Sequence, residues 1–478
     1  MRVKINDQNS LLSFYLRANY AYKEKYLLTI TGRSDASSKF PVNNRVGYFP
    51  SAGLGWVLNE EGFLKNVSWL NLLKLRVSAG YTGTQNIGDN LFYTLYTPSA
   101  YAGTNALISS QLGNDRIKWE TTLQKDLGID FAMFSSRLQG TIGYYEKRST
   151  DLLMEIPVAT SAGFTSVLEN FATIRNRGIE IELNGDILQG KNFQWNSALN
   201  ISANRSLVLK LNQTLSDPSS VAPSSDPIYN SFQLGNTILQ VGQPVGLIYG
   251  AKYLGVLKTQ AEVDQYKGLD IGAQYGLDPY LGIGDAKYQL LPAGGTRAGY
   301  PAKMVIGHAE PKFFGGFTNT FTYKRFSLMT LLTFSYGGDL IYLPQENNIG
   351  LGDQSNHDLS ILNHYSVSNP TSNNPRLILG QSEAQESGGI SSLDVFSDSY
   401  IKLKSLTLSY QLPQSFTDKL HIHNASVYVA GSNLLIITKY PGPDPEVSND
   451  PYSLIGGYTD DASYPTARIY SFGLRIGF

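Results

Sequence analysis

The end of the chain alternates strictly between apolar and polar residues. Four polar or small residues separate five apolar ones, which are Tyr470, Phe472, Leu474, Ile476 and Phe478. Because successive side chains of a strand point to opposite faces, this pattern predicts a strand with one apolar face and one polar face. A strand of this kind that ends in an aromatic residue is typical of an outer-membrane β-barrel, whose apolar face meets lipid and whose polar face lines a wet lumen.

The same period of two recurs along the whole chain. Ile179, Ile181 and Leu183, for example, alternate with Glu180 and Glu182. We predict thirteen strands, near residues 11–22, 25–36, 48–58, 71–82, 117–134, 137–154, 170–187, 193–209, 312–323, 326–338, 399–412, 425–437 and 467–478. A soluble β-sandwich would also alternate, but here the apolar faces are rich in aromatic residues near the strand ends.

The predicted connections differ in length in a regular way. Every second connection is short or of moderate length, whereas long outer loops are expected near residues 83–116, 210–311, 339–398 and 438–466. Short periplasmic turns and long outer loops are typical of outer-membrane barrels. A further candidate strand at 246–256 would break this parity in the barrel wall, so we place it inside the large outer loop.

Composition supports the barrel and excludes other classes of protein. The chain has 31 Tyr, 21 Phe and 46 Gly, only 16% of its residues are charged, and the longest apolar runs are too short for a membrane helix. A net charge of -1 without a run of Lys and Arg argues against nucleic-acid binding. The absence of Cys excludes disulfides and thiolate metal sites.

The strand count and the start of the chain suggest an incomplete barrel. A closed bacterial barrel made of one chain has an even number of strands, and thirteen is odd. The first predicted strand follows almost directly after Met1, with no segment that reads as a signal peptide. We therefore expect this chain to be the C-terminal part of a larger polypeptide.

Several motifs resemble the SusC/RagA family of TonB-dependent outer-membrane transporters. They occur in family order over nearly the whole chain, and include "LKLRVSAGYTGTQNIG" from Leu73, "NRGIEIEL" from Asn176, "FFGGFTNTFTYKRFSL" from Phe313 and "GSNLLIITKYPGPDPEV" from Gly431. The resemblance implies a barrel of about 22 strands. It also implies a plug domain and a TonB-contacting segment upstream, both absent here. The acidic loop that often precedes "IGHAEPKFFGG" in the family is replaced, so a calcium site does not carry over.

The resemblance also implies partners and a class of solute. A SusD-like surface lipoprotein would act as a lid, the TonB complex would act through the missing N-terminal region, and the solute would be an oligosaccharide or a peptide. The barrel-assembly machinery would recognise the terminal strand formed by Tyr470, Phe472, Leu474, Ile476 and Phe478.

One outer loop has the chemistry to bind a sugar. Phe92, Tyr93, Tyr96 and Tyr101 lie within 83–116, and aromatic rings can stack on the apolar faces of sugars. The alternative is that these rings pack the loop itself or contact the lid protein.

Enzymatic and metal-binding motifs are weak, and we expect no enzyme activity, cofactor or metal site. "GDILQGKN" from Gly185 approaches a phosphate-binding loop, but Asn192 replaces the Ser or Thr, and a hairpin turn is expected instead. His421 and His423 could ligate a metal, yet solvated histidines in a periplasmic turn are preferred. Asp444 and Glu446 of "GPDPEV" could form a carboxylate pair, but a rigid proline turn is preferred.

Three alternatives to an importer remain open at this point. A passive porin built from this chain alone would need an even number of strands. A truncated barrel without function would aggregate through its unpaired strand edges. A barrel lipase would need a Ser and a His side by side on the barrel surface, and no such pair is evident.

Overall fold

The computed structural model describes residues 8–101, 104–212, 231–267, 281–290, 301–345, 356–357, 359–378, 389–446 and 458–477. Phe478 lies outside these residues, and so does the side chain of Tyr101. Within the described residues, no helix has the length and the apolar character needed to cross a bilayer.

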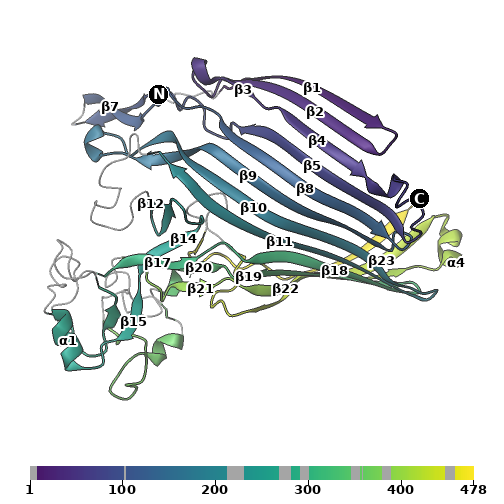
Figure 1. Ribbon diagram of the computed structural model, residues 1–478. Helices are drawn as coiled ribbons and strands as arrows, with labels where there is room; N and C mark the ends of the chain where they lie inside the picture. Colours follow the sequence, from purple (N-terminus) through teal and green to yellow (C-terminus); the bar gives the residue numbers. More distant parts are fainter. Residues whose placement is uncertain are drawn as a thin grey trace.

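A single antiparallel sheet dominates the fold and curves like the wall of a barrel (Figure 1). Thirteen strands follow one another across it in chain order: β1 (Leu11–Tyr22), β2 (Tyr26–Ser37), β4 (Ser51–Val57), β5 (Leu70–Thr84), β8 (Glu120–Met133), β9 (Leu138–Pro157), β10 (Ser166–Gln189), β11 (Phe193–Leu211), β18 (Phe313–Tyr323), β19 (Phe326–Tyr336), β22 (Tyr400–Gln411), β23 (Asn424–Thr438) and β25 (Ile469–Gly477). A fourteenth strand, β3 (Val46–Tyr48), pairs only with β2. Each of the predicted segments overlaps one strand of this path.

Two details differ from the prediction. The segment predicted at 48–58 is split into β3 and β4 at Phe49 and Pro50, because proline has no backbone N–H to donate to a sheet. β9 and β10 are longer than predicted at their outer ends, where register shifts near Asn170 and Ala172 interrupt the alternation.

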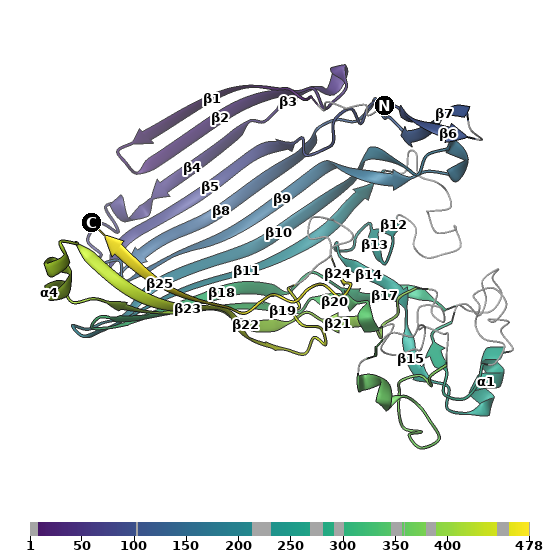
Figure 2. The ribbon, with the colours of Figure 1, turned by 180° about the vertical axis from the view of Figure 1, so that it is seen from behind.

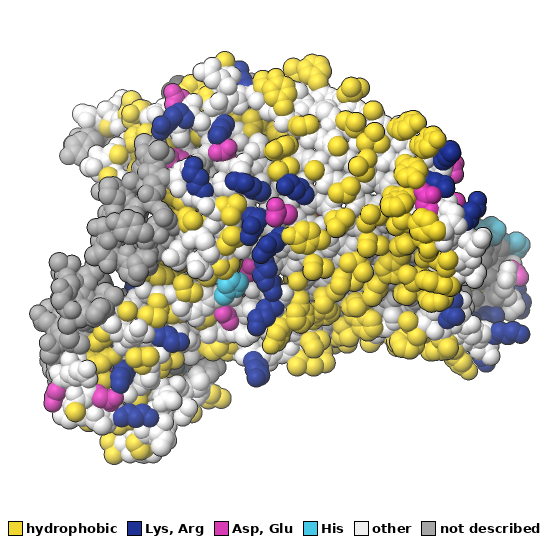
Figure 3. All heavy atoms as spheres, viewed as in Figure 1, with side chains coloured by type: hydrophobic (Ala, Val, Ile, Leu, Met, Phe, Trp, Pro, Cys, Tyr) yellow, Lys and Arg dark blue, Asp and Glu magenta, His cyan; other side chains and the backbone are white. Residues whose placement is uncertain are grey.

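The register aligns apolar residues into rows on the outer face of the sheet. One row of directly opposed partners crosses six strands and comprises Trp56, Leu75, Ile129, Ile142, Ile181 and Ile201. Figure 3 shows that apolar side chains cover this part of the surface, and Leu54 and Ile179 on it are 57% and 50% exposed. Such a continuous exposed apolar surface is the one that a barrel presents to lipid.

The two rims of the sheet differ as the connection lengths predicted. Tight turns lie at one rim, with left-handed backbone at Lys23, Glu24, Ser135 and Lys324. The helix α4 (Gln414–Thr417) and the 3-10 turns η2 (Leu58–Glu60) and η5 (Asp418–Leu420) also lie in connections at this rim. The opposite rim carries the long connections and a separate lobe (Figure 2).

The long connections contain short strands, most of which the sequence did not predict. β6 (Leu95–Tyr101) and β7 (Thr104–Gln111) form a hairpin, and β12 (Ser231–Leu234), β13 (Thr237–Gln240), β14 (Leu247–Ala251) and β17 (Lys303–His308) form a four-stranded sheet. The other outer elements are β15 (Tyr253–Val256), α1 (Gln260–Lys267), β16 (Ala286–Tyr288), β20 (Asp339–Tyr342), β21 (Val395–Ser397), β24 (Thr459–Asp460), and the turns η1 (Val42–Asn44), η3 (Thr160–Ala162) and η4 (Leu359–Asn363). The candidate strand at 246–256 appears here as β14 and β15, both outside the barrel wall, as predicted.

The buried core lies at the outer rim, not behind the apolar band. Its largest cluster joins the outer ends of β9, β10 and β11 to β12 and β13, through residues such as Leu152, Phe171, Val208, Phe232 and Leu239. Phe171 and Phe232 pack with ring centroids 4.9 Å apart. This packing attaches the outer lobe to the wall.

Candidate transport lumen and outer-loop sites

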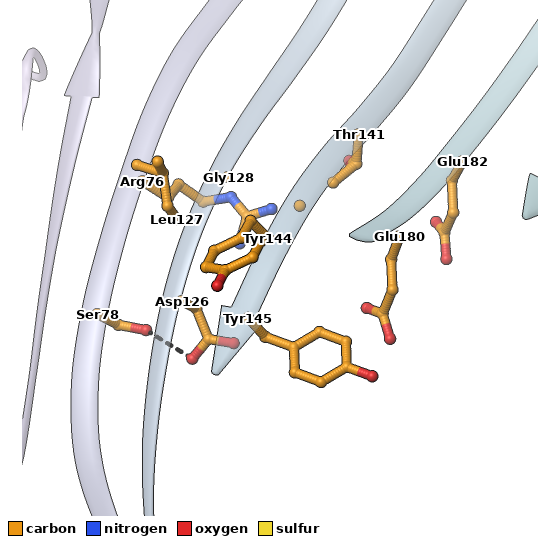
Figure 4. A pocket seen from close by; sticks show the side chains of 11 residues that line it. Arg76, Ser78, Asp126, Leu127, Gly128, Thr141, Tyr144, Tyr145, Glu180 and Glu182 are labelled. Atoms are coloured by element: carbon orange, nitrogen blue, oxygen red, sulfur yellow. Dashed lines mark hydrogen bonds between the residues drawn. The ribbon is translucent and has the colours of Figure 1, made fainter. Parts of the chain in front are cut away.

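The inner face of the wall is polar and bears a cluster of charged side chains. Alternation places Arg76 of β5, Asp126 and Asp130 of β8, and Glu180 and Glu182 of β10 on this face, opposite the apolar rows. Figure 4 shows most of these side chains around one cavity, together with Tyr145 of β9. The cavity has a volume of about 160 Å³.

Neighbouring polar groups hold three members of this cluster in place. The Arg76 guanidinium binds Asp130, with Nη2 2.8 Å from Oδ1, and Ser78 donates a 3.2 Å hydrogen bond to Asp126. Arg76 lies across Gly128, where an added Cβ atom would come within 2.9 Å of Nη2. Glycine at this position therefore leaves room for the guanidinium.

Glu180 and Glu182 differ from the other carboxylates of the cavity. Both are exposed to the lumen side, and no hydrogen bond or ion pair among the described residues involves either of them. Tyr145 donates its hydroxyl to Asn204, not to Glu180. The cavity thus presents two free negative charges, which can bind cationic or hydrogen-bond-donating groups of whatever occupies the lumen.

The predicted aromatic residues of the outer loop differ in burial, although the rings of Phe92 and Tyr93 lie 4.2 Å apart. Phe92 packs against the buried cluster of Phe40, Phe49, Ile117 and Trp119. Tyr93 and Tyr96 are 56% and 55% exposed, with Tyr96 6.3 Å from the ring of Phe164. Phe92 therefore packs the loop, whereas Tyr93 and Tyr96 remain accessible on the outer side.

The carboxylates of the "GPDPEV" motif are held by cations of the barrel wall. Lys402 of β22 lies 2.6 Å from Asp444 and 2.7 Å from Glu446, and the side chains of Lys402 and Asp444 are only 3% exposed. Thr466 also donates to Asp444, and Lys404 and Tyr400 contact Glu446 at 2.7 and 2.8 Å. Both acids therefore fix the loop to the wall, in agreement with the preferred proline turn.

The electrostatics of this cluster follow from its hydrogen bonds. Burial alone would raise the pKa of Asp444, but the hydrogen bonds from Lys402 and Thr466 outweigh it and lower that pKa. The same balance of burial against the two lysines lowers the pKa of Glu446. The sequence did not show this cluster because Lys402 lies 42 residues before Asp444.

The remaining candidates lie in turns and in the terminal strand of the wall. "GDILQGKN" forms the end of β10 and the turn into β11, with Lys324 N donating to Asn192 O across the neighbouring turn. His421 follows η5 with a left-handed backbone, and no group of three metal-ligating side chains occurs among the described residues. In β25, Tyr470, Phe472, Leu474 and Ile476 all face outward, and Phe472 is 78% exposed.

Comparison with known proteins places this wall in one family. Residues 3–434 match the family model described as TonB dependent receptor-like, beta-barrel. TonB-dependent receptor P3 of Formosa agariphila is 31% identical over 99% of this chain and 46% of its own length. TonB-dependent receptor SusC of Bacteroides thetaiotaomicron is 27% identical over 98% of this chain and 44% of its own length.

The structural comparison agrees with the sequence comparison. The RagAB peptide transporter superposes with a TM-score of 0.79 and 26% identity, over 98% of this chain and 48% of that chain. This chain spans about half the length of the curated relatives that it matches. It belongs to the TonB-dependent receptor β-barrel family and is a SusC/RagA-type β-barrel of the outer membrane.

Proposed function

We propose that this chain forms part of the barrel of a TonB-dependent importer that takes up oligosaccharides or peptides together with a SusD-like surface lipoprotein. The family is one of outer-membrane transporters and receptors, and RagAB is described as a peptide importer. The observation that carries the proposal is the polar inner wall with the free carboxylates Glu180 and Glu182. If this inner face packed against a buried protein core, unpaired carboxylates on it would cost free energy.

The free carboxylates suggest what fills the lumen. We propose that a plug domain, which the family resemblance implies, places basic or amide groups against Glu180 and Glu182. The wall supplies two acceptors within one cavity, and Arg76 is already engaged by Asp130. In this proposal residues 1–478 are the C-terminal part of the barrel, and the plug and the TonB contact lie upstream.

The outer aromatic side chains are the proposed ligand contacts. Tyr93 and Tyr96 remain candidates for stacking on a sugar ring or for contact with the lid lipoprotein, because both are exposed near the outer rim. Phe92 contributes indirectly by fixing the loop. Tyr101 stays a candidate on sequence alone.

The test compares two double variants with the parent, each expressed in cells from which the chromosomal gene is deleted. One double variant is Glu180→Gln/Glu182→Gln, and the other is Tyr93→Ala/Tyr96→Ala. We expect each double variant to reach the outer membrane at the parental level and to lower uptake of a fluorescent oligosaccharide or peptide at least fivefold. Tyr48→Ala is the matched control, because Tyr48 is an exposed tyrosine of β3 on the wall. Parental uptake by both double variants would contradict the proposed lumen and loop contacts.

A further inference from the structure

A line of cations runs along the outer edge of the lipid-facing apolar band. Figure 3 shows Lys and Arg side chains in a column between the apolar surface and the outer lobe. The strand registers place five cations of β8 to β11 on the outward face: Lys125, Arg148, Arg175, Arg177 and Arg205. Glu146 is the carboxylate that shares this part of the face.

The register places like charges directly opposite one another. Arg148 faces Arg175, and Arg177 faces Arg205 on the next strand. Directly opposed like charges destabilise a sheet. None of the ion pairs among the described residues involves these cations, although Arg205 donates hydrogen bonds to three backbone carbonyls. Glu146 lies directly opposite Lys125 and Arg177, so five cations share one carboxylate and the cluster keeps an excess of positive charge.

The height of the cluster fits the membrane interface. Ile187 near the inner end of β10 is 48% exposed, and Arg177 follows ten residues further toward the outer rim. At about 3.3 Å per residue and a tilt of roughly 40°, this spacing corresponds to about 25 Å along the membrane normal, the height of a barrel's apolar band. Arg177 thus lies at the level of the lipid headgroups on the side of the long loops.

An apolar groove lies on β4, β5, β8 and β9, and it reaches the cation cluster at Lys125. It has a volume of about 540 Å³, and its walls include Leu54, Val77 and Leu127, with the small residues Ala52 and Ala79 between them. Lys125 and Glu146 line the same groove. An acyl chain can fill such a groove while its headgroup reaches the cations above.

We propose that Lys125, Arg148, Arg175, Arg177 and Arg205 bind the phosphate groups of a phosphorylated lipid of the outer leaflet, with one acyl chain of that lipid in the groove beside Ala52 and Ala79. Phosphate suits paired guanidinium groups because it accepts two parallel hydrogen bonds from each. The apolar groove selects a lipid over a free anion.

The test uses the protein purified in mild detergent from outer membranes and native mass spectrometry with added lipid. The probes are a bisphosphorylated glucosamine lipid, the same lipid after phosphatase treatment, and inorganic phosphate. We expect the bisphosphorylated lipid to remain bound to the parent, and Arg177→Gln/Arg205→Gln to weaken its binding at least tenfold. The dephosphorylated lipid should bind the parent as weakly as the bisphosphorylated lipid binds this variant.

The matched control is Lys147→Gln, which removes a cation of β9 at the same height but on the lumen side, where Lys147 lies 5.0 Å from the Tyr145 ring. We expect this variant to bind the lipid like the parent. Ala79→Phe fills the groove and gives a second readout. It should weaken lipid binding at least fivefold without removing a charge. Equal lipid binding by the Arg double variant and the parent would overturn the proposal, and so would displacement of the lipid by millimolar inorganic phosphate.

Discussion

At the scale of single residues, charged side chains have different surroundings on the lumen face of the wall, on its lipid face and in the outer loop. Glu180 and Glu182 are free on the lumen side, the cations around Arg177 outnumber the single carboxylate Glu146 on the lipid side, and Lys402 pairs with Asp444 in the outer loop. The buried pair of Lys402 and Asp444 thus contrasts with the unpaired Glu180 and Glu182, which face a space where another molecule can reach them.

Lys402→Ala tests the role of the buried pair. The substitution leaves Asp444 buried without its cation, which typically costs roughly 3–5 kcal/mol. We expect the 440–446 loop to detach from β22 and to become sensitive to protease in the folded barrel. Lys404→Ala is the control, since Lys404 binds the same Glu446 but its side chain is 40% exposed, and a loss of at most about 1 kcal/mol is expected. Equal sensitivity of the two variants would contradict the assignment.

Asp398 makes the stability of the outer lobe depend on pH. Burial, and then the nearby Asp339, raise the pKa of Asp398 from 3.8 to about 6. Between about pH 4 and 6 the folded state therefore holds a proton that the unfolded state releases, so the free energy of unfolding decreases as the pH rises through this window. We expect Asp398→Asn to remove this decrease and to stabilise the lobe by about 2 kcal/mol at pH 7. Thermal unfolding of parent and variant at pH 4.5 and 7.5 measures the difference, and a variant that gains nothing at pH 7.5 would refute it.

At the scale of elements, the period of two was enough to locate the strands of the wall. Tyr470 to Ile476 and Ile179 to Leu183 alternate without interruption, and each lies in a wall strand. The short strands of the lobe, such as β12 and β21, were missed because three or four residues do not show a period and pair only through tertiary packing. The break between β3 and β4 at Pro50 could have been predicted, because proline has no backbone N–H to donate to a sheet.

The candidate sites were predictable only where they are local in sequence. Glu180 and Glu182 share one face in "NRGIEIEL", so their joint exposure follows from the alternation. The cation cluster was not predictable, because the sequence contains no run of Lys and Arg and the cluster forms across four strands through their register. Lys402 and Asp444 likewise meet only after the loop folds back.

The terminal strand gives a prediction at this scale. We propose that the outward-facing Tyr470, Phe472, Leu474 and Ile476, with Phe478, form the signal for barrel assembly. Deleting Phe478 from the intact protein should lower the amount that resists urea extraction from outer membranes several-fold. Ligand affinity of the inserted fraction should stay unchanged. If affinity per inserted molecule falls as far as insertion does, the residue acts in the folded barrel instead.

At the scale of the whole molecule, the parts form a wall with two different surroundings. An apolar band faces lipid, a polar and acidic face lines the lumen, and a packed lobe stands at the outer rim (Figures 1 and 3). Under the proposed function, this division lets a polar solute pass through the barrel while the outer loops and a lid protein select it. The proposal that energy from TonB drives that passage separates an importer from a passive porin.

The most direct test is uptake of labelled oligosaccharides and peptides by cells that carry the intact protein, with TonB present or inactivated. We predict that solute reaches the periplasm only when both the protein and TonB are present, and that the purified intact protein conducts no steady ion current in planar bilayers. Uptake that persists without TonB, together with steady conductance, would contradict the account and identify a passive porin.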